Sequence, residues 1–171
     1  MSNGSTTIRL ERDSDIAAIH AVEALAFGRE GEAVLVDALR DLNQDFISLV
    51  ASLEDEIIGH ICFSRVSIEG SASDGIVLAL APLAVLPDHQ RRGIGSMLVQ
   101  QGLQECKRRN VDAVFVVGDP RYYSRFGFRS TGEIDVRCEF DVPADAFKMI
   151  EFRQGCLSRG VLRYSQPFHH V

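Results

Sequence analysis

One stretch, residues 76–128, constrains the fold of this chain more than any other part. A near-continuous apolar run at residues 76–86 leads into a basic turn that contains glycine, at residues 90–96. An amphipathic helical pattern follows at residues 93–109, and a second apolar, β-branched run at residues 113–117. Because a strand, a helix and a strand in so few residues imply a parallel crossover, this stretch predicts two parallel strands, each buried on both faces.

Two residues inside this stretch predict local features of the packing. Pro82 lies within the first apolar run, and a proline cannot donate a ladder hydrogen bond, so we expect a β-bulge near residues 82–83. Gly102 lies in the middle of the helix, where glycine costs about 1 kcal/mol relative to alanine. We therefore expect the helix to approach the sheet closely at Gly102.

The rest of the chain adds helices and strands around this unit. Helices are predicted at residues 16–25, with Asp13, Ser14 and Asp15 as cap and first-turn residues, and at residues 30–42. Further strands are predicted at residues 6–10, 46–52, 57–67, 134–140, 147–152 and 160–164. A chain of 171 residues suffices for one domain over residues 1–171, with residues 1–5 as a frayed tail.

Composition excludes several classes of function. A formal net charge of −6 argues against nucleic acid as a partner, since neutralising phosphates needs a basic face. No apolar run reaches the roughly 18 residues of a membrane helix, and no charged-then-apolar leader opens the chain, so we expect a cytoplasmic protein without membrane association. The cysteines form no CxxC pair, and the terminal His169 and His170 lack neighbouring ligands, so no metal is expected. Buried thiols in a reducing compartment are expected at Cys62, Cys106, Cys138 and Cys156.

The turn at residues 90–96 has the composition of an anion site. A helix that begins there presents unpaired N–H groups and the positive end of its dipole, while Gly93 and Gly95 let a ligand approach the backbone. A dinucleotide fingerprint would need glycine where Leu98 stands, and a Walker loop would need Gly-Lys-Ser/Thr, which is absent. The turn therefore predicts phosphate binding of another kind.

At this turn the sequence resembles the GCN5-related N-acetyltransferase (GNAT) superfamily. The hexapeptide QRRGIG at residues 90–95 matches the pyrophosphate-binding signature of that family. The hexapeptide YSRFGF at residues 123–128 resembles its second marker, a tyrosine four residues before Gly-Phe. Softer matches to a group of small bacterial-type acetyltransferases are AFG at residues 26–28, DALR at 37–40 and GDPRYY at 118–123. The resemblance is clearest over residues 78–128.

The resemblance implies an α/β (α+β) fold with a central mixed, mostly antiparallel sheet of six to seven strands, flanked by about four helices. Strands 4 and 5, here residues 76–86 and 113–117, would splay apart, and the pantetheine arm of acetyl-CoA, the co-substrate, would lie in the opening. The bulge expected from Pro82 stands where the splaying would begin.

Carried over by position, the resemblance also implies roles for individual residues. Main-chain groups of the bulged strand would bind the pantetheine and the thioester, at Leu83, Ala84 and Val85. The turn would surround the pyrophosphate, with Gln90, Arg91, Arg92, Gly93, Ile94, Gly95 and Ser96. After a neutral amine has attacked the thioester, Tyr123 would protonate the departing thiolate, a role that suits a phenol with a pKa near 10.

The general base is left open by the sequence. Many family members carry a glutamate on the bulged strand, yet residues 76–86 contain no ionisable side chain. The first helices and the third strand usually border the acceptor site in this family, which makes candidates of His60, Glu23, Glu30 and Glu32. Water or self-ionisation of the substrate would also serve.

The leading hypothesis is an acetyl-CoA-dependent N-acetyltransferase that acts on a primary amine of a small-molecule or peptide acceptor, by direct attack in a ternary complex. The alternatives are transfer of another acyl group or transfer to a hydroxyl, and a catalytically weak acyl-CoA-binding module. The acidic net charge mildly favours cationic acceptors such as polyamines, aminoglycosides or lysine side chains. Homodimerisation through the C-terminal strands is a further option.

Overall fold

The structure, a computed structural model, describes residues 4–42, 44–71 and 74–171. The predicted frayed tail at residues 1–5 falls largely on residues 1–3, which lie outside the described residues. The α-helices are α1 (Ile16–Phe27), α2 (Gly31–Leu42), α3 (Ile94–Arg108) and α4 (Pro120–Ser124), and the short 3₁₀ helices are η1 (Asp13–Asp15), η2 (Pro87–His89), η3 (Thr131–Glu133) and η4 (Gln166–His170). The strands are β1 (Thr7–Leu10), β2 (Ile47–Leu53), β3 (Glu56–Glu69), β4 (Val77–Val85), β5 (Ala113–Val117), β6 (Arg129–Ser130), β7 (Val136–Cys138), β8 (Phe147–Glu151) and β9 (Gly160–Tyr164).

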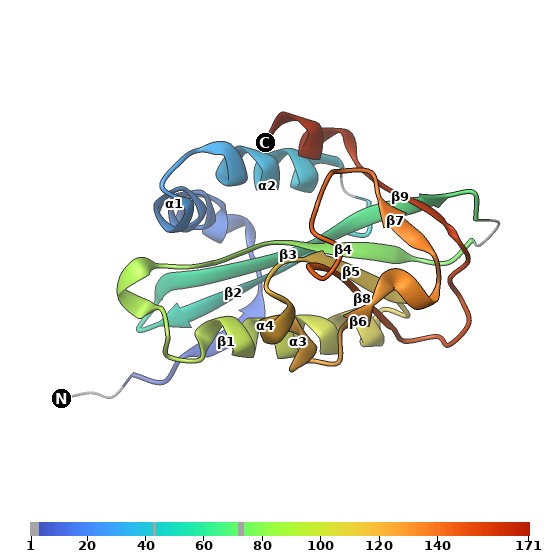
Figure 1. Cartoon of the computed structure of the whole chain (residues 1–171). Helices are drawn as coiled ribbons and strands as arrows, with labels where there is room; N and C mark the ends of the chain where they lie inside the picture. Colours follow the sequence, from blue (N-terminus) through green and yellow to red (C-terminus); the bar gives the residue numbers. More distant parts are fainter. Residues whose placement is uncertain (1–3, 43, 72–73) are drawn as a thin grey trace.

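The strands form one mixed sheet in the order β1-β2-β3-β4-β5-β8-β6 (Figure 1). Neighbours on this path are antiparallel except β4 and β5, which pair in parallel as predicted. The long strand β3 also pairs with β9 beyond its contact with β4, and β9 carries β7 as a further parallel neighbour. The mixed, mostly antiparallel sheet is thus confirmed. In addition, β7 and β9 extend it beside the C-terminal part of β3.

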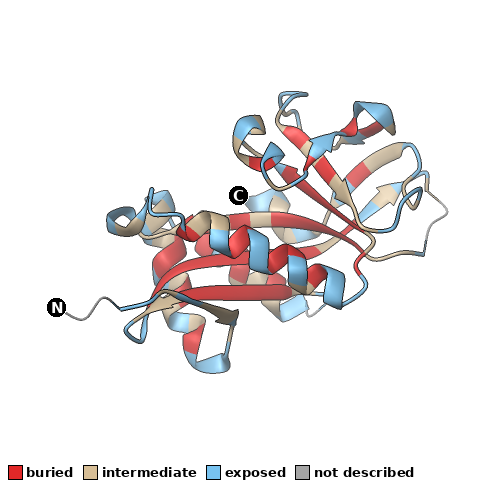
Figure 2. Ribbon diagram, turned by 90° about the horizontal axis from the view of Figure 1, so that it is seen from below, coloured by how far each residue is buried: buried red, intermediate tan, exposed pale blue. Residues whose placement is uncertain are grey.

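Helices cover both faces of the sheet. The pair α1 and α2 lies on one face, and α3 with α4 lies on the other (Figure 1). Viewed from the α3 side, the strands beneath the helix are almost wholly buried (Figure 2). Their side chains form one apolar core under α3, centred on Phe63 and Leu98, and another under α1 and α2, centred on Ile19 and Val36.

The contact of α3 with the sheet explains the glycine in mid-helix. A Cβ atom at Gly102 would lie 2.5 Å from the ring of Phe63 on β3, much closer than van der Waals contact allows. The predicted close approach at Gly102 is therefore confirmed. The helix gives up intrinsic propensity at this position so that an aromatic ring of the sheet can pack against its backbone.

A β-bulge interrupts β4 where it was expected. Ile61 stands opposite Leu83 and Phe63 opposite Leu80, so two residues of β4, Ala81 and Pro82, face a single residue of β3. The peptide bond between Ala81 and Pro82 is cis.

The bulge also marks the end of pairing between the two parallel strands. Pairing between β4 and β5 stops at Leu80 and Val116, which is the start of the bulge. The Cys62 thiol of β3 donates to the Ala81 carbonyl oxygen at 3.1 Å and satisfies that carbonyl group. The two parallel strands separate from this point onward, as predicted.

Some local predictions were wrong. Asp15 does not cap α1 with its side chain, because its carboxylate instead accepts the backbone N–H of Arg12 and pairs with Arg9 at 2.7 Å. The strand predicted at residues 134–140 is only β7.

Two cysteines and one short helix also depart from the expectations. Cys62 and Cys106 are buried, but Cys138 and Cys156 are only half-buried.

The segment that contains Tyr122 and Tyr123 forms a short helix, α4. This helix begins at Pro120 and is capped by the Asp119 carboxylate, which accepts the Arg121 N–H.

Within the described part of the chain, no helix combines the length and apolarity that crossing a membrane requires. The same residues hold no group of three or more His, Cys, Asp or Glu side chains that is arranged to bind a metal.

Candidate active site

A first cavity, here called the turn cavity, has a volume of about 550 Å³ and lies at the N-terminus of α3. It is lined by Leu83, Val85, His89, Gln90, Arg91, Gly93, Ile94, Gly95, Ser96, Tyr122 and Arg125. The structure thus brings together the residues that sequence predicted for the co-substrate, except two. Ala84 is buried with its side chain in the core under α1, and Arg92 is exposed but does not line the cavity.

The backbone of this turn is shaped to leave its N–H groups accessible. Gly93 caps α3 with a φ of 81°, and no atom stands within 4 Å of where its Cβ would be. Arg91 has a φ of 61°, so it too is left-handed. The Gln90 side chain donates to the Val85 carbonyl oxygen at 3.0 Å and ties the turn to the end of β4. Unpaired helix-terminal donors, open glycine and a neighbouring arginine together suit an anionic phosphate ligand.

A second cation lines this cavity, Arg125, which was not among the residues assigned to the co-substrate. Arg125 stacks over the Tyr122 ring, with its guanidinium carbon 5.2 Å from the ring centroid, and donates to the Ser96 hydroxyl at 3.1 Å. The spacing of three residues between Tyr122 and Arg125 was a usable signal, because such a pair shares one face of a helical turn.

A second cavity, here called the splay cavity, has a volume of about 680 Å³ and opens where β4 and β5 separate. It is lined by Phe27, Arg29, Glu32, Leu35, Leu80, Ala81, Pro82, Leu83, Val117, Tyr123, Phe140, Val142, Tyr164, Phe168 and Val171. Leu83 lines both cavities, so they adjoin at the bulged strand. A ligand bound at the turn would therefore reach the splay cavity along β4.

Tyr123 lies in the splay cavity at the C-terminal side of the strand opening. Its side chain is almost fully buried, at 9% exposure, and it packs edge-on against Phe128 with 5.7 Å between ring centroids. A Cβ at Gly118 would stand 2.4 Å from Cε2 of the Tyr123 ring, so glycine at that position makes room for the ring. Burial, helped by the adjacent Tyr122, raises the pKa of the Tyr123 phenol. The group therefore holds its proton through the neutral range and is available as a donor.

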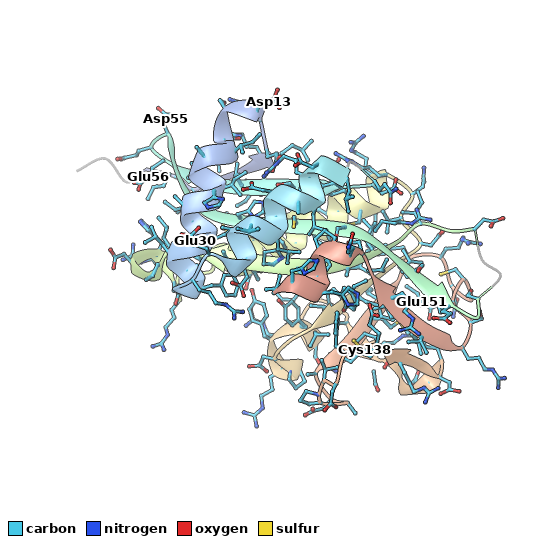
Figure 3. The ribbon with its side chains drawn as sticks, turned by 90° about the horizontal axis from the view of Figure 1, so that it is seen from above. Asp13, Glu30, Asp55, Glu56, Cys138 and Glu151 are labelled. Atoms are coloured by element: carbon cyan, nitrogen blue, oxygen red, sulfur yellow. The ribbon has the colours of Figure 1, made fainter. Side chains whose placement is uncertain are left out.

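Of the four residues considered as a general base, Glu32 alone lines the splay cavity. Its two carboxylate oxygens accept from Arg29, Oε1 from Nη2 at 2.5 Å and Oε2 from Nε at 3.1 Å. Glu30, labelled in Figure 3, is exposed, and its carboxylate pairs instead with the His20 ring at 2.9 Å.

Glu23 and His60 form a buried pair that lines neither cavity. Glu23 Oε1 lies 2.6 Å from His60 Nδ1, His60 Nε2 lies 2.7 Å from the Ser48 hydroxyl, and that hydroxyl donates to Glu11. Burial, with a smaller contribution from Glu32, raises the pKa of Glu23 to about 9, and burial lowers the pKa of His60 to about 3.

Because burial raises the pKa of Glu23 and lowers that of His60, both members of the pair are neutral at pH 7. Glu23 then donates to Nδ1 of His60, and Nε2–H of His60 donates to Ser48. Each hydrogen bond of the chain keeps one donor and one acceptor in this arrangement.

Comparison with known sequences points to one family. The sequence profile of the acetyltransferase (GNAT) family matches residues 15–128. The N-acetyltransferase YhbS of Escherichia coli is 32% identical over 165 residues, which cover 95% of this chain and 98% of the relative. The N-acetyltransferase YjhQ of Escherichia coli is 36% identical over 124 residues, covering 71% of this chain and 68% of the relative.

Solved structures agree with the sequence relatives. The crystal structure of Escherichia coli YhbS in complex with CoA superposes with a TM-score of 0.90 and 30% identity, covering 99% of this chain and 94% of that chain. A GNAT family acetyltransferase from Brucella melitensis, solved in complex with acetyl-CoA, gives a TM-score of 0.81 and 31% identity, covering 97% of this chain and 99% of that chain.

Proposed function

This chain belongs to the acetyltransferase (GNAT) family, and we propose that it transfers the acetyl group of acetyl-CoA to a primary amine by direct attack in a ternary complex. Its class is that of acetyl-CoA-dependent acyltransferases. The observation that carries the proposed reaction is the junction of the two cavities at Leu83, with Tyr123 beside it. One ligand at the turn and another in the splay cavity would meet there.

The turn cavity supports acetyl-CoA as the co-substrate. Its glycine-containing backbone, its free helix-terminal donors and the cations Arg91 and Arg125 suit a pyrophosphate. Two similar proteins were crystallised with CoA or acetyl-CoA. From this cavity the edge of β4 that has lost its β5 partner leads toward Leu83, and main-chain groups of this edge would hold the pantetheine arm.

The chemistry proposed at the junction balances without a further reagent. A neutral amine attacks the thioester carbon, the new C–N bond forms and the C–S bond breaks, so that CoA leaves as a thiolate. Tyr123 donates its proton to the thiolate sulfur. The proton lost by the amine nitrogen passes to solvent or to a protein carboxylate, and the phenolate regains its own proton from solvent. The position of the phenol in the splay cavity supports this role, and the phenol carries its proton before the attack, as a general acid must.

Tyr123→Phe tests this proposal. Loss of a general acid removes about 10²–10⁴-fold of rate, so kcat should fall by that order while the affinity for acetyl-CoA stays nearly unchanged. Turnover is measured as CoA thiol released in the presence of an amine panel, and affinity by calorimetry. Tyr122→Phe is the contrast, since Tyr122 lines the turn cavity and its loss should affect acetyl-CoA affinity rather than kcat. Unaltered turnover of Tyr123→Phe at every pH would remove Tyr123 from the mechanism.

A further inference from the structure

The splay cavity has one continuous aromatic wall. The ring of Tyr164 lies between Phe140 and Phe168, with centroid separations of 5.2 Å and 4.9 Å. These residues come from the loop after β7, from β9 and from η4, and η4 packs against α2. Figure 3 shows that packing from above, with the C-terminal segment beside α2. The wall thus lines the same cavity as the bulged strand β4.

Charge in the splay cavity is confined to one place. Among its lining residues the charged side chains are Arg29 and Glu32, and the others are apolar or aromatic. The Glu32 side chain is 9% exposed, whereas that of Arg29 is 62% exposed. Each Glu32 oxygen accepts one bond from Arg29 and keeps a second lone pair, so the carboxylate has capacity for an additional N–H donor.

This distribution excludes highly polar acceptors on energetic grounds. A polyamine would bury further ammonium groups against apolar side chains, with Glu32 as the one carboxylate side chain in the lining, and unpaired buried charge is very costly. An aminoglycoside would leave hydroxyl groups without partners, and each such buried group costs about 1–3 kcal/mol. A flat apolar body, in contrast, matches a wall of aromatic rings, which favours edge-on or offset stacking.

We propose that the acceptor is an aralkylamine, a primary amine carried on an aromatic ring by a short chain, with its ring against Phe140, Tyr164 and Phe168 and its amino group directed to Glu32. The assignment rests on the acetyl transfer proposed above. It names the substrate class for that reaction and departs from the polyamines, aminoglycosides and lysine side chains that net charge alone suggested.

Binding of the amine is measurable without turnover. The chain contains no tryptophan, so tryptamine supplies the sole indole fluorescence in a mixture with the protein and CoA. Its anisotropy should rise when CoA-saturated protein is added. Glu32→Gln should weaken this binding at least tenfold because the neutral amide cannot pair with the ammonium group. Equal binding by wild type and Glu32→Gln would overturn the role of the carboxylate.

Turnover distinguishes the ring from the amino group. Thiol release from acetyl-CoA is compared for phenethylamine, for n-butylamine, which lacks a ring, and for spermidine, kanamycin and a lysine peptide. Phenethylamine should give a kcat/KM at least tenfold above each of the others. Phe140→Leu should remove most of this advantage by raising KM for phenethylamine, with KM for acetyl-CoA unchanged and kcat/KM for n-butylamine reduced far less. Those two constants also report that the variant is folded, and Phe168→Leu provides a second test of the wall.

Three outcomes contradict the proposal. Spermidine, kanamycin or the peptide is the preferred acceptor; or the advantage of phenethylamine persists in both wall variants; or octanoyl-CoA outperforms acetyl-CoA with no preference for a ring, so that the wall houses an acyl chain. Tryptamine binding without thiol release from any acceptor would instead leave the cavity assignment intact and refute acetyl transfer, which separates the two claims.

Discussion

Gly95 lines the turn cavity next to Tyr122 of α4. A Cβ atom there would lie 3.0 Å from the Tyr122 hydroxyl, tighter than most real contacts. The first turn of α3 also carries the positive end of the helix dipole, which favours an anion beside it. Both bulk and negative charge at this residue would therefore act against a phosphate ligand.

Gly95→Glu is expected to abolish acetyl-CoA binding in calorimetry. The added side chain displaces Tyr122 and fills the cavity, and its carboxylate repels the pyrophosphate. Gln104→Glu is the matched control, because it adds the same charge on the exposed face of the same helix and should leave the affinity unchanged. Retained binding by Gly95→Glu would contradict a phosphate site at the turn.

The two cavities differed in how far their residues were predictable from sequence. The turn cavity is built mainly from contiguous residues, so its motif carried Gln90, Gly93 and Gly95 together. The splay cavity draws its walls from segments as distant as Phe27 and Phe168. Nothing in the local pattern around either residue indicates that they share a cavity, because their proximity depends on how α2 and η4 pack.

At the scale of elements, one glycine, Gly102, allows α3 to pack closely against the sheet. Gly102→Ala gains about 1 kcal/mol of helix propensity. Against this, the new methyl group overlaps the Phe63 ring, and overpacking of this kind costs about 1–3 kcal/mol. We expect the loss to prevail, since the overlap at 2.5 Å involves a fully buried ring, so urea unfolding should show a lower free energy of unfolding.

Two comparisons isolate that effect. Gln104→Ala, on the exposed face of α3, should stabilise the protein slightly through propensity alone. Adding Phe63→Leu to Gly102→Ala should recover part of the loss, giving a non-additive pair as expected for residues in contact. If Gly102→Ala is instead as stable as Gln104→Ala, the packing explanation is wrong.

Elements with long apolar runs were predicted best. The β4 and β5 runs and the stripe of α3 are long enough for periodicity to identify them, and Pro82 indicated the bulge within one residue. Short elements such as α4 and β6 were missed. They depend on a single cap or on pairing with β8, which no local pattern records.

At the scale of the whole molecule, the Glu23–His60 pair links three elements through buried hydrogen bonds. Glu23 lies on α1, His60 on β3 and Ser48 on β2, and the chain of bonds ends at Glu11, whose carboxylate pairs with Arg40 of α2 at 2.6 Å. The neutral state of the pair makes this linkage dependent on pH.

The contribution of this pair to the free energy of unfolding should therefore be greatest between about pH 4.5 and pH 6.5. The Glu23 pKa is raised from 4.5 to about 9, so the folded protein holds a proton that the unfolded chain releases, and stability falls as pH rises through that window. The His60 pKa is lowered from 6.5 to about 3, so the unfolded chain binds the extra proton, and stability is lost as pH falls from 6.5 toward 3. Between 4.5 and 6.5 the two slopes oppose each other.

Glu23→Gln removes the first of these slopes. Urea unfolding at pH 6.5 and pH 9 should show a decline in wild type larger than in Glu23→Gln by about 3 kcal/mol. Groups that do not contact Glu23 titrate alike in both proteins, so the difference reports Glu23 and its immediate partners. The same decline in both proteins would show that Glu23 is ionised in the fold.

The separation of β4 from β5 leaves a gap between two neighbouring strands in the middle of the sheet. Beyond Leu80 no strand of the described residues pairs with β4 on the β5 side, and a linear substrate arm along that edge would take the place of the absent neighbour. A ligand that binds only the folded chain stabilises it by about 2.7 kcal/mol at a hundred times its dissociation constant. The free energy of unfolding would then depend on the supply of the ligand as well as on the sequence of the chain.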